Sequence, residues 1–494
     1  MKKNEKILLL ILFIFCFSLR LAFITQKNLW FDELYSWKMI QGSFTDIIFG
    51  TASDIHPPLF YFILKIWNIL FGESVFSMRL LTSICTSSAI FFIYPLSRKL
   101  LDERRSLLVL VLYSLSPLNI FFSQEVRMAA LNVLLCTASV YYLVRMIETA
   151  SNKYYKNIYI YLYIFTTVFA LYTHYFSFLI IIAQIIFILY YYHLEIKSLV
   201  HYLVIYIIIG LCYLAWIPTM LVQVSKGQPW RYPQNIMQVL NDALIYTRDV
   251  SLGFYHRYIN QYLLMIYTGI VLLILVFALI GYFSTVRTKS VEESQHKSAG
   301  FRWLIFLTVF IPLLLAMIIS FRQWIEFFKY LSILIPFIIV FAFIGFQSYP
   351  KFIKITAFIL FTAISIYGDF LYYHYDFKND DYRGIINIIN TNYNDNDKVY
   401  VYPYYFAWSI DYYCKEDNLR FKGSNNYGWE YESLIDTLRT SKPLSFWFVL
   451  DYHAQDSSTY NDKLNRILSN YKVTYEKTFN IIPDKVILYK FIKE

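Results

Sequence analysis

The chain has 494 residues, of which 58% are hydrophobic and 16% are charged, and its mean hydropathy is +0.45. A water-soluble protein cannot bury that much apolar surface. The aromatic content of 20% excludes a disordered chain, and a total of 14 glycines and 13 prolines excludes a fibrous repeat. The composition therefore predicts a polytopic α-helical membrane protein.

The net charge of +10 belongs to the apolar part of the chain. The first 374 residues carry 29 Lys and Arg against 17 Asp and Glu, whereas the last 120 carry 15 against 17. A basic excess spread between apolar segments is typical of cytoplasmic loops and differs from the basic face of a nucleic-acid groove. We therefore expect no nucleic-acid partner. The same division predicts a transmembrane domain over residues 1–374 and a polar domain over residues 375–494.

The transmembrane part contains about eleven candidate spans. A helix that crosses the bilayer needs about 20 mostly apolar residues, and we searched for such segments between charges and turn residues. In chain order they are Ile7–Ile24, Val75–Ser97, Leu107–Phe122, Met128–Ile147, Ile158–Tyr172, Phe176–Tyr192, Leu199–Leu221, Tyr262–Phe283, Leu304–Ser320, Tyr330–Phe346 and Ile355–Tyr373. No small-residue cleavage site follows the first segment, so it is expected to remain as a helix.

The basic residues between the spans predict the orientation. With the N-terminus in the cytoplasm, every basic cluster falls on the cytoplasmic side. These clusters are Arg98/Lys99/Arg104/Arg105, Lys153/Lys156, Lys197, Arg287/Lys289/Lys297 and Lys351/Lys354. An odd number of spans then places the C-terminal domain outside, together with loops at about 26–74 and 222–261. The expected location is the plasma (inner) membrane.

The first external loop carries two adjacent carboxylates, Asp32 and Glu33, among large aromatic residues. Charges held at a membrane edge are costly and are therefore candidates for function. In such a setting one carboxylate can accept a proton from a nucleophilic hydroxyl, because partial burial raises its pKa toward the working range. The alternative is a helix N-terminus, with Asp32 as its cap and Glu33 in its first turn.

A second polar cluster follows in the same loop. Pro57 and Pro58 fix the chain just before the short apolar segment Leu59–Phe71, which suits a helix lying in the membrane interface. Asp54 and His56 are thereby placed at the N-terminal end of that helix, where backbone N–H groups favour an anion such as a phosphate. For His56 alone, the alternative is a hydrogen-bonded turn residue.

Two further external stretches have less definite meaning. Residues 226–257 mix basic and aromatic groups, which fits either a flap over a substrate or an aromatic anchor at the interface. Glu326 is a candidate acceptor contact.

The C-terminal domain is expected to be a small α/β domain. Strand-like runs alternate with helix-like runs along it, and it shows neither a phosphate loop nor a nucleophile elbow. The expected strands are Lys398–Tyr402, Leu444–Leu450, Lys472–Phe479 and Lys485–Phe491, and the expected helices are Asp381–Ile389, Tyr431–Leu438 and Asn461–Leu468. Asp451 follows a strand and is either a functional residue or a solvated turn residue.

Taken together, these motifs resemble the polytopic GT-C glycosyltransferases, and family 39 in particular. That family includes protein O-mannosyltransferases, the bacterial lipid A aminoarabinose transferase and galacturonosyltransferase-like relatives. The motifs that carry the resemblance are Asp32-Glu33, Asp54-x-His56-Pro57-Pro58-Leu59, Arg79-Leu80 and Ser123-Gln124-Glu125-x-Arg127-Met128. Thr173-His174-Tyr175, at the outer end of the fifth span, is similar to a motif of the bacterial relatives.

The resemblance implies roles for the matching residues. Asp32 would act as base or orient the acceptor, with Glu33 as its partner. Asp54 and His56 would close the site, while Arg79 and Arg127 would support the loop or the donor phosphate. Where the family often has Arg-Tyr, this chain has Lys329-Tyr330. A lysine neutralises a phosphate as a point charge but lacks the bidentate fork of arginine. The family also often has Tyr after Arg-Met, where this chain has Ala129.

The donor of such enzymes is a sugar on a polyprenyl phosphate, so no nucleotide site is required, and the sequence contains none. Asp32 would deprotonate an acceptor hydroxyl, which would attack the anomeric carbon and invert its configuration. Cationic side chains would stabilise the leaving phosphate. The richness in Ile, Asn, Lys and Tyr is typical of an AT-rich bacterial genome and favours undecaprenyl phosphate as carrier. The expected partners are this donor, membrane lipids and a glycan, lipid or protein acceptor.

Three alternatives stay open. A divalent metal is a candidate cofactor, with Asp54, His56 and His174 as ligands. A transporter or flippase of lipid-linked sugars is the main alternative function, although the sequence shows neither an internal repeat nor charges at the centres of the spans. A membrane-anchored binding protein would leave the Asp32/Glu33 and His56 clusters without a purpose.

Overall fold

The chain forms two compact units in a computed structural model. The structure describes residues 3–149, 157–228, 231–253, 259–287, 293–374, 381–395, 397–402, 406–416, 431–451, 466–480 and 485–493. Unit 1 contains Met1–Ala22, Gly42–Phe71 and Met78–Tyr375, and unit 2 contains Phe23–Gln41, Gly72–Ser77 and Asp376–Glu494. The predicted first external loop is therefore divided between the two units.

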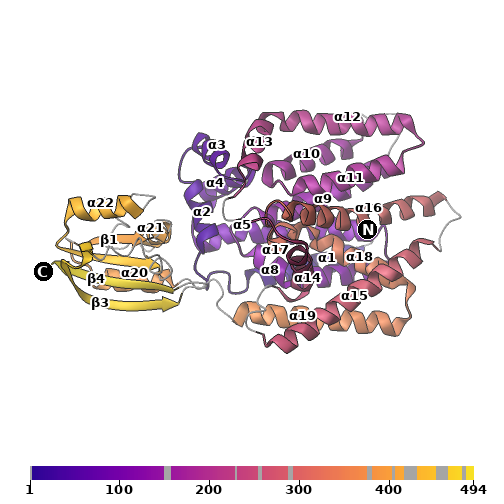
Figure 1. The fold of residues 1–494 in the computed structure, drawn as a ribbon. Helices are drawn as coiled ribbons and strands as arrows, with labels where there is room; N and C mark the ends of the chain where they lie inside the picture. Colours follow the sequence, from indigo (N-terminus) through magenta and orange to yellow (C-terminus); the bar gives the residue numbers. More distant parts are fainter. Residues whose placement is uncertain are drawn as a thin grey trace. The chain divides into compact units, whose positions relative to one another are not determined.

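Unit 1 is helical (Figure 1). Its helices are α1 (Lys3–Leu21), α3 (Phe44–Ser53), α4 (Leu59–Phe71), α5 (Val75–Ser88), α6 (Ile90–Ser97), α7 (Glu103–Ser114), α8 (Pro117–Ser123), α9 (Ala129–Glu148), α10 (Ile158–Thr173), α11 (Ser177–Tyr191), α12 (Ile196–Tyr213), α13 (Ile217–Lys226), α14 (Ile236–Leu252), α15 (Gln261–Arg287), α16 (Glu293–Ser320), α17 (Phe327–Tyr330), α18 (Ile335–Gly345) and α19 (Lys351–His374). Short 3₁₀ turns follow some of them: η2 (Leu214–Trp216), η4 (Ser332–Leu334) and η5 (Phe346–Ser348). Helices α10, α11 and α12 lie side by side.

Six helical segments of the described chain are long and apolar enough to cross a membrane. They are Val75–Ser97, Ala129–Glu148, Ile196–Lys226, Gln261–Thr285, Ala299–Ser320 and Lys351–His374. Helices α7 and α8 form a seventh candidate that is bent by 59°. Ser116 at the bend is extended (φ −72°, ψ 114°), as expected for a residue before a proline.

The predicted apolar segments all coincide with helices, but among the described residues six or seven, not eleven, qualify by length and composition as full-length spans. Several of the others are shorter apolar helices: Leu59–Phe71, Ile158–Thr173, Ser177–Tyr191 and Ser332–Ser348. Helix α1 carries charged residues near both of its ends. The apolar composition of the sequence locates each helix correctly. The length of a helix depends in addition on where the chain bends, which composition does not show.

A buried polar network fixes the turn between α8 and α9. Arg20 of α1 is fully buried and donates hydrogen bonds to the carbonyl oxygens of Tyr113 and Ser114. The side-chain amide of Gln124 donates in turn to the carbonyl oxygen of Arg20, at 2.8 Å, and the hydroxyl of Tyr372 donates to Gln124 Oε1 at 2.6 Å. Because each buried polar group has a partner, the network holds the turn after α8 in one position.

Unit 2 contains a four-stranded mixed sheet. Its elements are α2 (Phe31–Met39), α20 (Tyr382–Thr391), β1 (Lys398–Tyr402), α21 (Ala407–Glu416), α22 (Tyr431–Ser441), β2 (Ser445–Asp451), β3 (Tyr471–Asn480) and β4 (Lys485–Lys493). The strand order is β1-β2-β4-β3, with β1 parallel to β2 and the other pairs antiparallel. The connection between β1 and β2 contains α21 and α22, as a parallel pair requires a long crossover.

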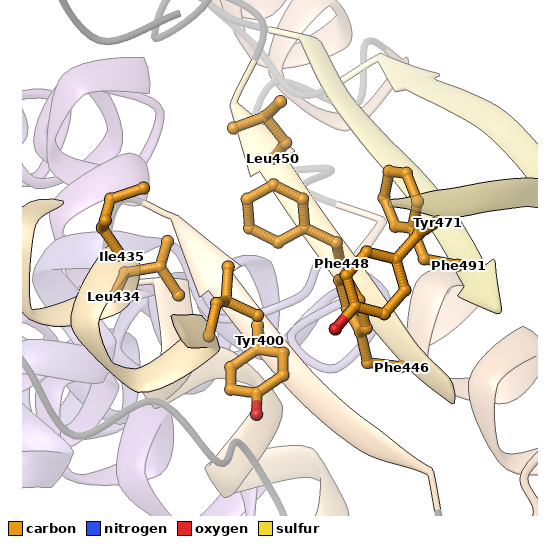
Figure 2. Close-up of a cluster of buried hydrophobic side chains, with 9 residues drawn as sticks. Tyr400, Leu434, Ile435, Phe446, Phe448, Leu450, Tyr471 and Phe491 are labelled. Carbon is orange, nitrogen blue, oxygen red and sulfur yellow. The ribbon is translucent and has the colours of Figure 1, made fainter. Parts of the chain in front are cut away.

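The core of unit 2 lies between α22 and one face of the sheet (Figure 2). Leu434 and Ile435 of α22 contribute to it from one side. Phe446 and Phe448 are two residues apart in β2. Their side chains therefore point to the same face of the sheet, because successive side chains on a strand point to opposite faces. The Phe446 ring stacks on Phe491 of β4 with centroids 5.0 Å apart.

The prediction of a small α/β domain at the C-terminus is confirmed. All four strands occur within two residues of their expected bounds, and Asp381–Ile389 and Tyr431–Leu438 are helical. Helix α21 was not predicted. The predicted helix Asn461–Leu468 lies partly outside the described residues. Asp451 ends β2 as expected, but its side chain is likewise outside them.

Candidate active site

Four segments of unit 1 meet around a small cavity. The cavity has a volume of about 20 Å³, room for roughly one water molecule. Its lining comes from the turn before α4, from the turn before α9 with the first turn of that helix, from the residue after α10, and from α17 with the residues after it. The lining residues are His56, Phe122, Glu125, Arg127, Met128, Ala129, Asn132, His174, Lys329, Tyr330, Ser332 and Ile333.

Arg127 lies at the centre of the polar contacts. It follows the Gln124 turn described above and is 5% exposed. Its Nη2 atom lies 3.3 Å from His56 Nε2, and its Nη1 donates to the hydroxyl of Tyr61 at 3.3 Å. The guanidinium therefore joins the turn before α9 to the start of α4.

The proline pair places His56. Pro57 and Pro58 are both buried, and α4 begins directly after them, as the sequence predicted. The carbonyl oxygen of Pro58 accepts the first hydrogen bond of this helix, from Phe62 N at 3.1 Å. A proline fixes φ near the helical value without needing a backbone donor, which suits the first turn. His56 is therefore held just outside the helix, where it is 5% exposed.

His174 and Tyr330 complete the wall on the other side. The His174 ring lies 5.5 Å from the His56 ring and 5.3 Å from the Tyr330 ring, measured between centroids. His174 Nδ1 accepts a hydrogen bond from Phe176 N at 3.1 Å. An accepting Nδ1 carries no proton, so the neutral ring holds its proton on Nε2.

Arg231 adds a second guanidinium to this wall. Its Nη2 donates to Glu326 Oε2 at 2.9 Å and to the hydroxyl of Tyr330 at 2.6 Å, and its Cζ lies 4.9 Å from the centroid of the Tyr330 ring. The Arg231 side chain is 7% exposed. A charge-assisted pair combined with a cation–π contact fixes the tyrosine ring against the cavity.

The site has a positive electrostatic potential. Burial, followed by the charges of Arg127, Lys329 and Arg231, lowers the pKa of His174 to about 3. Burial and the same cations also hold the pKa of His56 well below its usual range. Both imidazoles are therefore neutral at pH 7, and the remaining positive charge favours an anion over a cation.

These depressed pKa values predict acid sensitivity. Because the folded pKa of His174 lies below the unfolded value of 6.5, the unfolded state takes up more protons as the pH falls below 6.5, and stability decreases. His174→Asn keeps an acceptor for the Phe176 N–H without the titration. Between pH 7 and pH 5 the variant should lose roughly 1–2 kcal/mol less stability than the wild type. Thermal unfolding of the purified protein at both pH values measures this, and equal losses would contradict it.

Two predicted residues of unit 1 lie elsewhere. Asp54 caps the C-terminus of α3. Burial, with a smaller contribution from the charge of Asp54, raises the pKa of Tyr175 to about 12. Gln223 of α13 holds this turn by donating to the carbonyl oxygens of Thr51 and Ala52, at 2.6 and 3.1 Å. Arg79 is buried in α5. Neither Asp54 nor Arg79 is among the residues that line the cavity.

The predicted metal-ligand set is not formed. In the part of the chain that the structure describes, no three His, Cys, Asp or Glu side chains lie close enough together to hold a metal ion. The set of Asp54, His56 and His174 is therefore corrected: the two imidazoles are neighbours, but Arg127 lies against His56 Nε2. A guanidinium in that position opposes the binding of a second cation.

Asp32 and Glu33 belong to unit 2 and lie in the first turn of α2. Glu33 is fully buried, and its Oε2 accepts from Trp30 N at 3.3 Å, which is the backbone half of a capping box. The cap position is Trp30 and not Asp32, whose side chain is half-buried. The two carboxylates therefore have different surroundings.

Helix α2 is attached to α21 of the same unit. Phe31 stacks on Trp408 with centroids 5.7 Å apart, and Trp37 meets Tyr412 edge-on at 5.2 Å. At the start of the helix, Leu29 N donates to the Tyr413 hydroxyl at 2.6 Å. Residues of α21, nearly 400 positions further along the chain, thus fix the position of the segment that carries Asp32.

Glu73 strengthens this attachment. It accepts from Trp37 Nε1 at 2.7 Å and forms an ion pair with Lys415 of α21. Although partial burial acts to raise it, the pKa of Glu73 is lowered by hydrogen bonds from Lys415, Trp37 and Gln41. The carboxylate is therefore ionised at neutral pH and links α2, the segment before α5, and α21.

Five predicted site residues thus line one cavity: His56, Arg127, His174, Lys329 and Tyr330. Sequence reasoning did not single out Arg231, because the stretch around it has the composition of an interfacial anchor. Glu326, a candidate acceptor contact in the sequence, is the ion-pair partner of Arg231. Glu125 belongs to a recognised motif, and its place in the lining could have been inferred from its distance of two residues from Arg127.

Comparisons with known proteins agree with this arrangement. The family model described as dolichyl-phosphate-mannose-protein mannosyltransferase matches residues 55–217, about a third of the chain. The structure of ArnT from Cupriavidus metallidurans bound to undecaprenyl phosphate superimposes with a TM-score of 0.57 at 10% identity, over 97% of each chain. No curated protein sequence is significantly similar to the chain.

Two structures of the Archaeoglobus fulgidus oligosaccharyltransferase are also similar. AglB in complex with an inhibitory peptide and a dolichol-phosphate has a TM-score of 0.53 at 10% identity, over 98% of this chain and 74% of that one. The complex of the same enzyme with Zn and sulfate has a TM-score of 0.52 at 12% identity, over 96% and 72%.

The chain therefore has the fold of these GT-C structures, with a multi-pass helical membrane part and a C-terminal α/β unit. Residues 55–217, which contain the motifs around His56 and Arg127, are similar to the dolichyl-phosphate-mannose-protein mannosyltransferase family.

Proposed function

We propose that the protein is an inverting membrane glycosyltransferase. It transfers a sugar from a polyprenyl-phosphate donor, undecaprenyl phosphate in a bacterial membrane, to a hydroxyl or phosphate of a glycan, lipid or protein acceptor. The similarity to ArnT and AglB, which were solved with undecaprenyl phosphate and dolichol-phosphate, supports a lipid-linked donor.

The observation that carries the proposal is the buried cationic cavity. Arg127 and Lys329 line the site together with Glu125 and two neutral imidazoles, and Arg231, paired with Glu326, contacts the lining residue Tyr330. Cations that border a cavity attract an anionic ligand. A phosphate joined to a membrane-bound isoprenoid is the anion that fits a site carried by apolar helices.

The proposed reaction is a single displacement. The acceptor oxygen attacks the anomeric carbon and gives its proton to a general base, for which Asp32 is the candidate from the sequence. The bond from the anomeric carbon to the phosphate oxygen breaks, and the polyprenyl phosphate leaves with the electron pair. Arg127 and Lys329 stabilise the negative charge that develops on it, an effect that is larger in the transition state than in the ground state.

The proposed topology places this reaction on the outer face of the membrane. The N-terminus lies in the cytoplasm, and unit 2 lies outside, as the basic loops favour. Lys472→Cys, on the exposed side of β3, should react with a membrane-impermeant maleimide in intact cells, whereas Arg104→Cys should react only after lysis. The reverse labelling pattern would contradict the orientation.

The function itself is tested with purified protein in detergent. Supplied with a radiolabelled undecaprenyl-phosphate sugar and an envelope extract, the wild type should transfer the label to the acceptor and release undecaprenyl phosphate. A transporter of lipid-linked sugars would leave the donor intact, because transport breaks no bond in it. A micelle also has no two compartments between which the donor could move. Absence of product with every sugar of a broad donor panel would reject the transferase assignment.

Lys329 offers a sharper test within the site. Lys329→Met removes a charge that faces the cavity and should lower turnover roughly 10–100-fold, because the leaving phosphate loses a stabilising cation. Lys329→Arg keeps the charge and supplies the bidentate fork that the family often has here, so it should retain most of the activity. Steady-state rates at saturating donor compare the variants. Equal activity of Lys329→Met and wild type would exclude a role for this charge.

A further inference from the structure

A second hollow lies in unit 1, near the ends of α7 and α18 that are remote from the candidate active site. The first turn of α7 carries Arg104 and Arg105, and its continuation α8 carries the cavity-lining Phe122 near its other end. Likewise, η4 borders the cavity, and α18 leads away from it to Phe346. With a rise of about 1.5 Å per residue, the two ends of α18 lie roughly 15 Å apart. The region around Arg104 and Phe346 is therefore separate from the candidate active site.

A groove of about 480 Å³ lies there between α7, α15, α18 and α19. Its walls are aliphatic and aromatic, with Leu112, Ile339, Ala342 and Phe358 among them. This volume is in the range of sites that bind small molecules. The apolar interior suits a hydrocarbon chain.

The rim of the groove is basic. Arg104 and Arg105 lie on the first turn of α7, and Lys351 and Lys354 on the first turn of α19. Asp102 is the acidic residue of the lining, and it pairs with Arg105 at 3.1 Å and caps α7. The rim therefore keeps an excess of three positive charges, and the positive ends of two helix dipoles add to it.

An apolar groove with a cationic rim matches one kind of ligand. A neutral lipid would fill the apolar walls but would not neutralise the basic rim. A free phosphate would neutralise the rim but would leave the apolar walls uncovered. Basic pockets between membrane helices recognise anionic headgroups, and each Lys or Arg near the membrane surface contributes to that attraction.

We propose that this groove binds one anionic phospholipid. Its phosphate lies among Arg104, Lys351 and Lys354, and an acyl chain lies along α18. The ligand is a structural lipid at the end of the unit opposite to the candidate active site, and the proposal is independent of the transferase function.

Native mass spectrometry of the full-length protein tests this inference. Phosphatidylglycerol or phosphatidylcholine is added in mixed micelles. The wild type should retain one phosphatidylglycerol, and an Arg104→Gln, Lys351→Gln, Lys354→Gln variant should bind it roughly 100-fold more weakly. A matched variant with Lys398→Gln, Lys472→Gln and Lys477→Gln, which changes three exposed lysines of unit 2, should bind like the wild type.

Two further measurements separate the two parts of the site. Ala342→Trp fills the groove without changing any charge and should also weaken the binding of phosphatidylglycerol. Glycerol 1-phosphate, the headgroup without acyl chains, should not compete. Equal retention of the two phospholipids, unchanged binding by the triple glutamine variant, or full competition by glycerol 1-phosphate would each overturn the proposal.

Discussion

Arg127→Gln is expected to lower glycosyl transfer about 100–1000-fold while leaving the protein folded. The guanidinium lies between His56 and Tyr61 and borders the cavity beside which we place the donor phosphate. Glutamine keeps a hydrogen-bond donor for Tyr61 but removes the charge, so the loss measures the electrostatic part of the interaction. Initial rates with a radiolabelled donor, at matched amounts of purified protein, give the value.

Arg145→Gln is the matched control. Arg127 precedes α9 and Arg145 lies in the last turn of the same helix, where it pairs with Glu148 and contacts Tyr159. Both changes remove one partly or fully buried arginine that flanks this helix. Arg145→Gln should retain the transfer rate, because its site lies at the other end of α9. If both variants lost activity equally, the effect of Arg127 would be one of folding and not of catalysis.

The cavity could be predicted in large part, because its residues stand in short motifs next to helix ends. Pro57-Pro58 marks the start of α4, and the turn with Arg127 precedes α9, so their positions relative to the helices follow from local sequence. Arg231 could not be found this way. Its meaning depends on contacts with Glu326 and Tyr330, about 95 and 99 residues further along the chain, and no local pattern encodes that pairing.

The attachment of α2 to α21 lies beyond sequence reasoning for the same reason. The aromatic residues around Asp32 suggested a membrane interface, yet Phe31 and Trp37 contact Trp408 and Tyr412. Aromatic side chains serve equally well at lipid interfaces and in protein cores, and composition does not distinguish the two uses. The structure thereby gives unit 2 a role that the sequence left open: it fixes the helix that carries the two adjacent carboxylates.

Asp32→Asn should lower turnover about 100–10,000-fold, the range that general-base catalysis contributes. The change is nearly isosteric, and the cap of α2 does not depend on this side chain. Protein level and thermal stability should therefore stay at wild-type values. Transfer from a radiolabelled donor, measured in membranes with equal amounts of each protein, provides the test, and unchanged turnover would remove Asp32 from the mechanism.

Glu33→Gln separates the two neighbouring carboxylates. The Glu33 side chain is used in the capping box, and glutamine can make the same bond to Trp30 N. We therefore expect Glu33→Gln to retain most of the activity, whereas Glu33→Ala should destabilise α2 by roughly 0.5–2 kcal/mol. A loss in Glu33→Gln as large as that in Asp32→Asn would instead place both carboxylates in the chemistry. Trp408 of α21 packs on Phe31 and Tyr35 of α2, so Trp408→Ala tests whether the position of α2 matters for turnover. If it does, this variant should show a part of the Asp32→Asn defect.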